Sequence, residues 1–158
     1  MSKPTARKPT FMASGYETSI ARCAVAVLLV VLGIVWIVVY IHFAKDAALY
    51  DPKLGGKKPD NPLPWMADLA RWNYLIGFVL IFAGLTVAAH KKTPLGRGRG
   101  VVVGMLFCFL FGLLYILIYY FLGDNIAKIP VMKDLNQFNL LVGIGFMAVG
   151  FAYATRWE

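Results

Sequence analysis

The sequence contains little charge and little cysteine. Asp, Glu, Lys and Arg together make up 15% of the 158 residues, whereas about a quarter of a soluble domain is charged. This shortage argues against a soluble enzyme and against a disordered tail protein. The two cysteines, Cys23 and Cys108, show no CxxC or Cys/His spacing, so no zinc motif is present and both are predicted to be free thiols.

Motifs for enzyme chemistry are also missing. The sequence has no H-E-x-x-H motif, no nucleophile–base pair and no glycine-rich phosphate loop after a soluble strand. Residues 96–100, which read GRGRG, are interpreted as a flexible basic turn. We therefore predict no enzyme activity, no cofactor and no metal site.

Long apolar runs are the main feature that is present. Residues 24–43 and 101–122 contain no Asp, Glu, Lys or Arg. Both runs exceed the roughly 18 apolar residues that indicate a membrane-spanning helix. Two shorter apolar stretches, residues 73–89 and 139–155, complete the set. The sequence thus predicts an all-α, polytopic protein with four transmembrane helices in the lipid bilayer.

The basic residues lie between the apolar runs. The chain has 16 Lys and Arg against 8 Asp and Glu, a net charge of +8, but the cations do not form a nucleic-acid-binding surface and no nucleic acid partner is predicted. The tail, residues 90–100 and the C-terminus hold nine cations against two acids, and the other two loops hold seven against six. The positive-inside rule then places both termini and the middle linker in the cytoplasm.

The chain repeats itself. Residues 61–92 align with residues 127–158 at a constant offset of 66 without a gap. Because each copy holds two spans, both copies insert in the same orientation, which makes a parallel repeat of helical hairpins. The identical pairs are Pro64/Pro130, Met66/Met132, Asp68/Asp134, Leu69/Leu135, Asn73/Asn139, Leu75/Leu141, Gly77/Gly143, Gly84/Gly150 and Ala88/Ala154.

The predicted organisation follows from these runs. It consists of a disordered cytoplasmic tail at 1–22; a first hairpin at 23–92 with spans at about 24–43 and 73–89 and an outer loop at 44–72; a cytoplasmic linker at 93–100; and a second hairpin at 101–158 with spans at about 101–122 and 139–155.

The repeated positions form one face of each second helix. Small residues on a helix face let backbones approach closely, and an asparagine can hydrogen-bond to a neighbouring helix. The face either packs the two helices of one hairpin together or binds another membrane protein. Its candidate residues are Asn73, Gly77 and Gly84 in the first copy and Asn139, Gly143 and Gly150 in the second.

An aromatic segment precedes the second span. If residues 64–72 are helical, then Trp65, Met66, Leu69 and Trp72 share one face and Asp68 points away. Tryptophan favours the headgroup level of a membrane. The strip either contacts a partner at the outer surface, with Asp68 setting the orientation, or only anchors the segment in the interface.

The segment Trp65 to Tyr74, WMADLARWNY, followed by GLT at residues 84–86, resembles the CrgA family of actinobacterial cell-division membrane proteins. The Arg156-Trp157 ending of the second copy resembles the end of that family's second helix. Members of the family have one hairpin, whereas this chain is similar to two hairpins fused head to tail. The second copy has also lost both tryptophans of the motif.

The resemblance implies a non-enzymatic scaffold or regulator of cell division in the cell membrane, enriched at the division septum. Its implied partners are the tubulin-like ring protein FtsZ and proteins of septal peptidoglycan synthesis, with self-association as a further option. A small four-helix transporter or channel subunit is the alternative, although such pathways usually need a charge inside a span. An accessory subunit of another envelope complex is a third.

Overall fold

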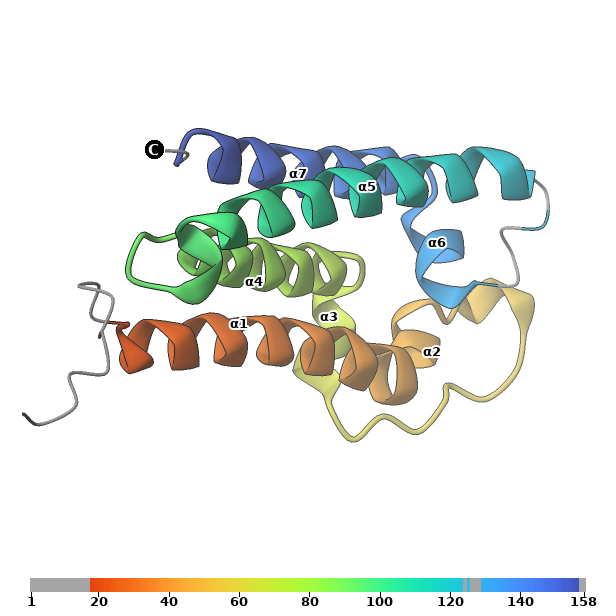
Figure 1. The fold of residues 1–158 in the computed structure, drawn as a ribbon. Helices are drawn as coiled ribbons and strands as arrows, with labels where there is room; N and C mark the ends of the chain where they lie inside the picture. Colours follow the sequence, from red (N-terminus) through yellow and green to blue (C-terminus); the bar gives the residue numbers. More distant parts are fainter. Residues whose placement is uncertain (1–17, 124, 126–128, 157–158) are drawn as a thin grey trace, which may run out of the picture.

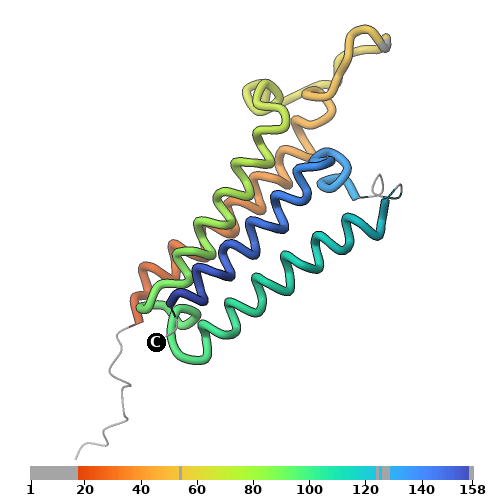
Figure 2. Tube along the Cα trace, turned by 90° about the horizontal axis from the view of Figure 1, so that it is seen from above, coloured from red at the N-terminus to blue at the C-terminus, as the bar shows by residue number. Residues whose placement is uncertain are grey.

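The structure is a bundle of four long helices that lie side by side (Figures 1 and 2). The computed structural model describes residues 18–123, 125 and 129–156, and this part of the chain contains helices and turns but no strand. The long helices are α1 (Ile20–Val39), α4 (Trp72–Ala88), α5 (Arg99–Leu122) and α7 (Phe138–Ala154).

The first helix is longer than the sequence predicts. Helix α1 continues through a π-helical turn, η1 (Tyr40–Ala44), into α2 (Lys45–Ala48), so that one apolar helix of 29 residues runs from Ile20 to Ala48. The helix therefore extends beyond the predicted span of about 24–43 at both ends. The Ser19 hydroxyl accepts a hydrogen bond from the Arg22 amide and caps the helix start.

The far end of this helix stays ordered because it packs against the rest of the chain. Ala44 and Ala47 are buried although they fall in the predicted outer loop. The predicted disordered tail lies outside the described residues up to residue 17, and its last three residues, 20–22, belong to α1.

Four short helices connect the long ones. They are η2 (Pro52–Leu54), α3 (Pro64–Leu69), η3 (Pro94–Gly96) and α6 (Pro130–Leu135). Helices α3 and α6 lie at one end of the bundle, which we call the elbow end, and η3 lies at the other, which we call the linker end (Figure 2). Helices α1 and α5 both begin at the linker end.

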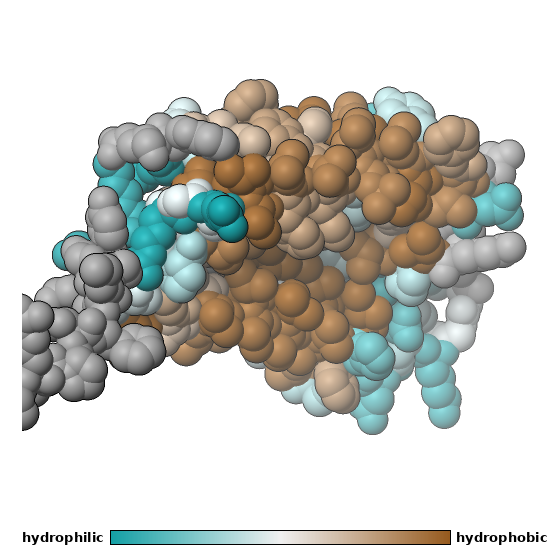
Figure 3. Space-filling model, viewed as in Figure 1, coloured by the Kyte–Doolittle hydropathy of each residue, from teal (hydrophilic) through white to brown (hydrophobic). Residues whose placement is uncertain are grey.

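The surface of the bundle is apolar along most of its length. Figure 3 shows a broad hydrophobic band with hydrophilic residues at both ends. Large side chains such as Leu28, Val103, Leu110 and Phe107 are about half exposed or more on α1 and α5. Exposed apolar area of this extent is typical of a surface that contacts a membrane or another protein. The helices Ile20–Ala48 and Arg99–Leu122 are long and apolar enough to cross a membrane, and α4 and α7 are shorter apolar helices.

Each hairpin is held together by glycines at helix crossings. A Cβ on Gly33 of α1 would lie 2.6 Å from the Gly77 carbonyl oxygen of α4. A Cβ on Gly112 of α5 would lie 2.6 Å from the Gly143 carbonyl oxygen of α7. The same close approach thus occurs at equivalent positions of α1–α4 and α5–α7, and only glycine permits it.

The two hairpins meet mainly through α4 and α7. The Phe82 ring packs edge-on against Phe146 at a centroid distance of 5.1 Å and lies over Gly145. Nearer the linker end, the Tyr153 hydroxyl donates a hydrogen bond of 3.1 Å to the Leu85 carbonyl. Helix α1 packs mainly against α4, and α5 packs mainly against α7.

Candidate functional site

The chain turns sharply before each second helix of a hairpin. Helices α3 and α6 each begin with proline, which suits the first helical position, and each is followed by a residue with positive φ. These residues are Ala70, with φ 43°, and Asn136, with φ 48°. Neither residue is glycine, so a positive φ strains the backbone at both positions. Contacts with the surrounding residues must offset this strain. We call the two turns the elbows.

The elbow corrects the prediction of one continuous helix over residues 64–72. Helix α3 ends at Leu69, and Trp72 is the first residue of α4. The positive φ at Ala70 changes the direction of the chain, so side chains before and after it no longer share a face. The predicted strip is therefore divided: Met66 is 2% exposed and belongs to the core, whereas Trp72 is 66% exposed.

The remaining residues of the aromatic segment have mixed environments. Trp65 is half exposed and its ring packs against Trp36 of α1, with centroids 5.6 Å apart. Leu69 is half-buried and Asp68 is exposed. Trp65, Asp68 and Trp72 thus remain accessible at the elbow end.

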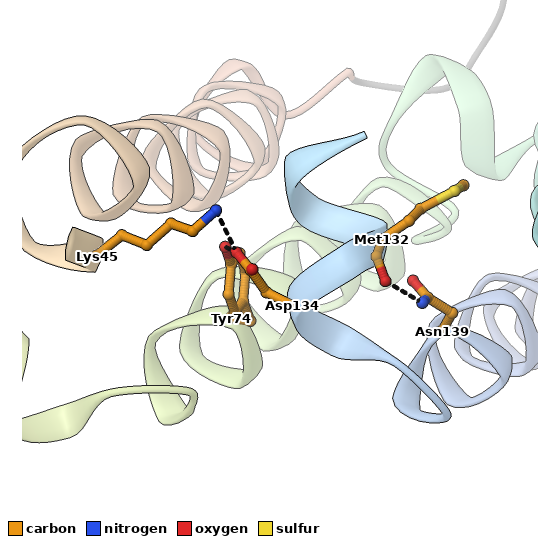
Figure 4. A network of polar contacts seen from close by, with 5 residues as sticks. All are labelled: Lys45, Tyr74, Met132, Asp134 and Asn139. Atoms are coloured by element: carbon orange, nitrogen blue, oxygen red, sulfur yellow. Dashed lines mark hydrogen bonds and ion pairs between the residues drawn. The ribbon is translucent and has the colours of Figure 1, made fainter. Parts of the chain in front are cut away.

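The repeated asparagines hold the elbows in place. The Asn73 amide nitrogen donates hydrogen bonds to the carbonyls of Met66, at 2.7 Å, and Ala70, at 2.9 Å. Asn139 donates in the same way to Met132, at 2.6 Å (Figure 4), and to Asn136, at 2.7 Å. These carbonyls at the end of a short helix would otherwise lack partners. The repeated asparagine therefore stabilises the strained turn next to it.

Only the second hairpin adds a bond from this asparagine to the neighbouring helix. The Tyr115 hydroxyl of α5 donates to the Asn139 side-chain oxygen at 2.8 Å. In the first hairpin the equivalent atoms, Trp36 Nε1 and Asn73 Oδ1, are buried without a hydrogen-bond partner among the described residues. The asparagine–helix contact expected from the sequence is thus present in one copy.

The repeated glycines lie inside their own hairpins. Gly77 faces Ile37 of α1, and Gly84 faces Ala26 and Val30 of the same helix. In the second hairpin, Gly143 faces Ile116 of α5 and Gly150 faces the Phe109 ring of that helix. A partner protein could reach this glycine face only by separating the two helices of a hairpin.

Sequence reasoning missed a buried polar contact between the hairpins. The Asp134 carboxylate of α6 lies 2.7 Å from the Lys45 ammonium and accepts a hydrogen bond of 2.5 Å from the Tyr74 hydroxyl (Figure 4). The side chains of Asp134 and Lys45 are 8% and 16% exposed. Tyr40 packs edge-on against Tyr74 at 5.1 Å. We call Lys45, Tyr74 and Asp134 the inter-hairpin clamp.

The only sequence signal for the clamp was the identity of Asp68 and Asp134 in the repeat. That signal does not separate the two residues, because Asp68 is exposed whereas the Asp134 side chain is only 8% exposed. Lys45 lay in a segment predicted to be a loop. The pairing therefore emerges only when α2 and α6 are placed side by side.

The linker end has polar contacts of its own. The Ser19 amide donates to the Lys92 carbonyl at 2.9 Å, and the Arg22 guanidinium contacts both ring nitrogens of His90. Because a guanidinium can only donate, this contact needs an unprotonated ring nitrogen. Burial and the nearby Arg22 charge lower the pKa of His90 below its ordinary value of 6.5. The start of α1 is thus tied to the end of α4.

No group of three or more His, Cys, Asp or Glu side chains that could hold a metal ion occurs in the described part of the chain. Cys23 is half-buried, Cys108 is buried, and both are free thiols.

These features define the class of protein: an all-helical, membrane-associated chain built from two similar hairpins. The model of the family "Cell division protein CrgA" matches residues 2–92 and again residues 87–158. The chain therefore belongs to the CrgA family of cell division proteins, in a tandem arrangement.

Curated relatives agree with this assignment. Cell division protein CrgA of Streptomyces avermitilis is 34% identical over 64 residues, which cover 40% of this chain and 71% of the relative. Cell division protein CrgA of Mycobacterium sp. strain KMS is 33% identical over 92 residues, which cover 56% of this chain and 84% of the relative. No solved structure matches the chain.

Proposed function

We propose that the chain crosses the cell membrane four times, with both termini and the linker in the cytoplasm and the elbow end outside. The charge distribution along the sequence supports this topology, and so does the shared starting end of α1 and α5. Helices α4 and α7 have 17 residues each, which corresponds to about 25 Å. That length is slightly shorter than a hydrocarbon core of about 30 Å, a mismatch that local thinning accommodates.

The proposed role is that of a non-enzymatic scaffold or regulator that coordinates septum formation and septal peptidoglycan synthesis through protein contacts. The observation that carries this proposal is the double match of a cell-division family to the chain. The basic tail and linker would face an FtsZ-type ring protein in the cytoplasm. The elbow end would face the proteins of septal peptidoglycan synthesis.

The proposed outer contact surface consists of Trp65, Asp68 and Trp72. These side chains are accessible at the elbow end, and tryptophan is enriched among the residues that dominate binding energy at interfaces. The glycine face is a less suitable surface, because Gly77 and Gly84 are occupied by α1.

A fluorescent fusion in dividing mycobacterial cells tests the function. We expect bands at the septum, and a uniform membrane signal would contradict the proposal. Topology is tested separately with reporter fusions. Fusions at residue 95 should be active only with a cytoplasmic reporter and fusions at residue 56 only with an external one, so an externally active reporter at residue 95 would overturn the four-span arrangement.

A further inference from the structure

An apolar groove lies between the two hairpins at the elbow end. It has a volume of about 490 Å³ and is bounded by α4, α7 and the end of α6. Its walls are almost entirely hydrocarbon, from Leu75, Phe78 and Phe82 on one side and Leu141 and Val142 on the other. The groove lies apart from the glycine faces, and it shares one residue, Trp72, with the proposed outer contact surface.

The mouth of the groove carries one unpaired positive charge. Arg71 lines the mouth and is exposed, and its guanidinium has no ion pair or hydrogen bond within residues 18–123, 125 and 129–156. Asp134 also lines the groove, but its charge is offset by Lys45 at 2.7 Å. The mouth therefore favours an anion, and a guanidinium is well suited to bind a phosphate.

The dimensions favour a single hydrocarbon chain. The ten residue steps from Trp72 to Phe82 correspond to a depth of about 15 Å, which is half of a hydrocarbon core of about 30 Å. An acyl chain of a phospholipid extends through one leaflet of the membrane, whereas a membrane-spanning helix of a partner protein extends through both. The depth of the groove therefore matches the length of one acyl chain better than the length of a membrane-spanning helix.

We propose that this groove binds one acyl chain of an anionic phospholipid of the outer leaflet, with the lipid phosphate on Arg71. The exposed Trp72 and Phe138 rings at the mouth would lie at the headgroup level, where aromatic side chains are favoured. Such a lipid fills the space between the hairpins and adds to the α4–α7 contact. The proposal rests on the four-span topology of the proposed function.

The site is tested by native mass spectrometry of the full chain, released from nanodiscs that contain phosphatidylglycerol and phosphatidylcholine. The measurement shows which lipid stays bound to the protein. We expect one retained phosphatidylglycerol in preference to phosphatidylcholine. Arg71→Gln should lower that preference about fivefold, the effect of one cation near a lipid surface. Lys133→Gln removes an exposed cation at the same end that does not line the groove, and it should leave the preference unchanged.

The apolar wall is tested by filling it. Leu75→Trp should abolish lipid retention, whereas Leu32→Trp, at a similarly exposed leucine of α1 outside the groove, should not. The proposal is wrong if the unmodified protein retains no lipid or shows no headgroup preference. It is also wrong if Arg71→Gln or Leu75→Trp behaves like the unmodified protein.

A photoreactive benzophenone side chain at Leu141, in membranes, identifies the occupant directly. An adduct enriched in anionic phospholipid relative to the same probe at Leu32 supports the proposal. An adduct with a second copy or with another protein overturns it. Because the lipid assay uses purified protein, loss of lipid binding and loss of septal localisation are separate results.

Discussion

The inter-hairpin clamp should be a major determinant of how the two hairpins stay together, and Asp134→Ala tests this. The substitution leaves the largely buried Lys45 ammonium without its counter-charge and the Tyr74 hydroxyl without its acceptor. Removing one partner of a buried ion pair costs about 3–5 kcal/mol. Because Lys45 is 16% exposed and partly reaches water, we expect a loss of about 2–4 kcal/mol in the free energy of unfolding.

The repeat supplies a matched control for this experiment. Asp68→Ala removes the same side chain from the equivalent position of the first hairpin, where it is exposed. Exposed substitutions away from special features change stability by about 0.5 kcal/mol or less. Unfolding by SDS titration in detergent micelles measures both variants. If Asp134→Ala and Asp68→Ala lose the same small free energy, the clamp does not stabilise the contact between the hairpins.

A double substitution separates charge loss from loss of packing. Replacing Lys45 by Met together with Asp134 by Leu removes both charges and keeps apolar volume. Apolar replacements of buried ion pairs are often neutral or stabilising. We therefore expect the double variant to recover most of the stability lost in Asp134→Ala, and a double-mutant cycle gives the coupling energy between the two residues. If the free-energy losses of the single variants Lys45→Met and Asp134→Leu simply add up in the double variant, the two residues do not interact directly.

Three further predictions concern other parts of the chain. Gly77→Leu should lower the free energy of unfolding by about 1–3 kcal/mol or more, because α1 occupies the space of the new side chain. The control Ala83→Leu, on the exposed face of α4, should have little effect in the same SDS titration. Because burial and nearby cations lower the pKa of His90, protonation costs more in the folded state. The free energy of unfolding should therefore be highest above pH 6.5 and should fall as the pH drops below that value. The variant His90→Gln should show no such decrease between pH 7.5 and 5. The double variant Trp65→Phe, Trp72→Phe should insert normally but show weaker binding to septal proteins in a two-hybrid assay, and unchanged binding would mean that the aromatic segment only anchors the protein.

Local sequence patterns determined the helical class and the repeat. Apolar runs without charge predict long apolar helices because hydropathy depends on composition alone. The spacing of Gly77 and Gly84 predicts a close helix crossing because small residues on one face allow it, and the structure adds which helix fills that face. The aligned Pro, Met, Asp and Asn positions predicted two similar units, and the double family match agrees with them.

The tertiary structure alone decided what equivalent residues do. Asp68 and Asp134 occupy the same position of the repeat, yet one is exposed and the other pairs with Lys45. The positive φ of Ala70 divides the aromatic segment, although alanine by itself favours a continuous helix. Periodicity describes one helix at a time, whereas burial, charge pairing and backbone strain depend on which helices come together. The difference between the two aspartates therefore arises from the contact of α6 with the first hairpin, which a pattern within either copy does not contain.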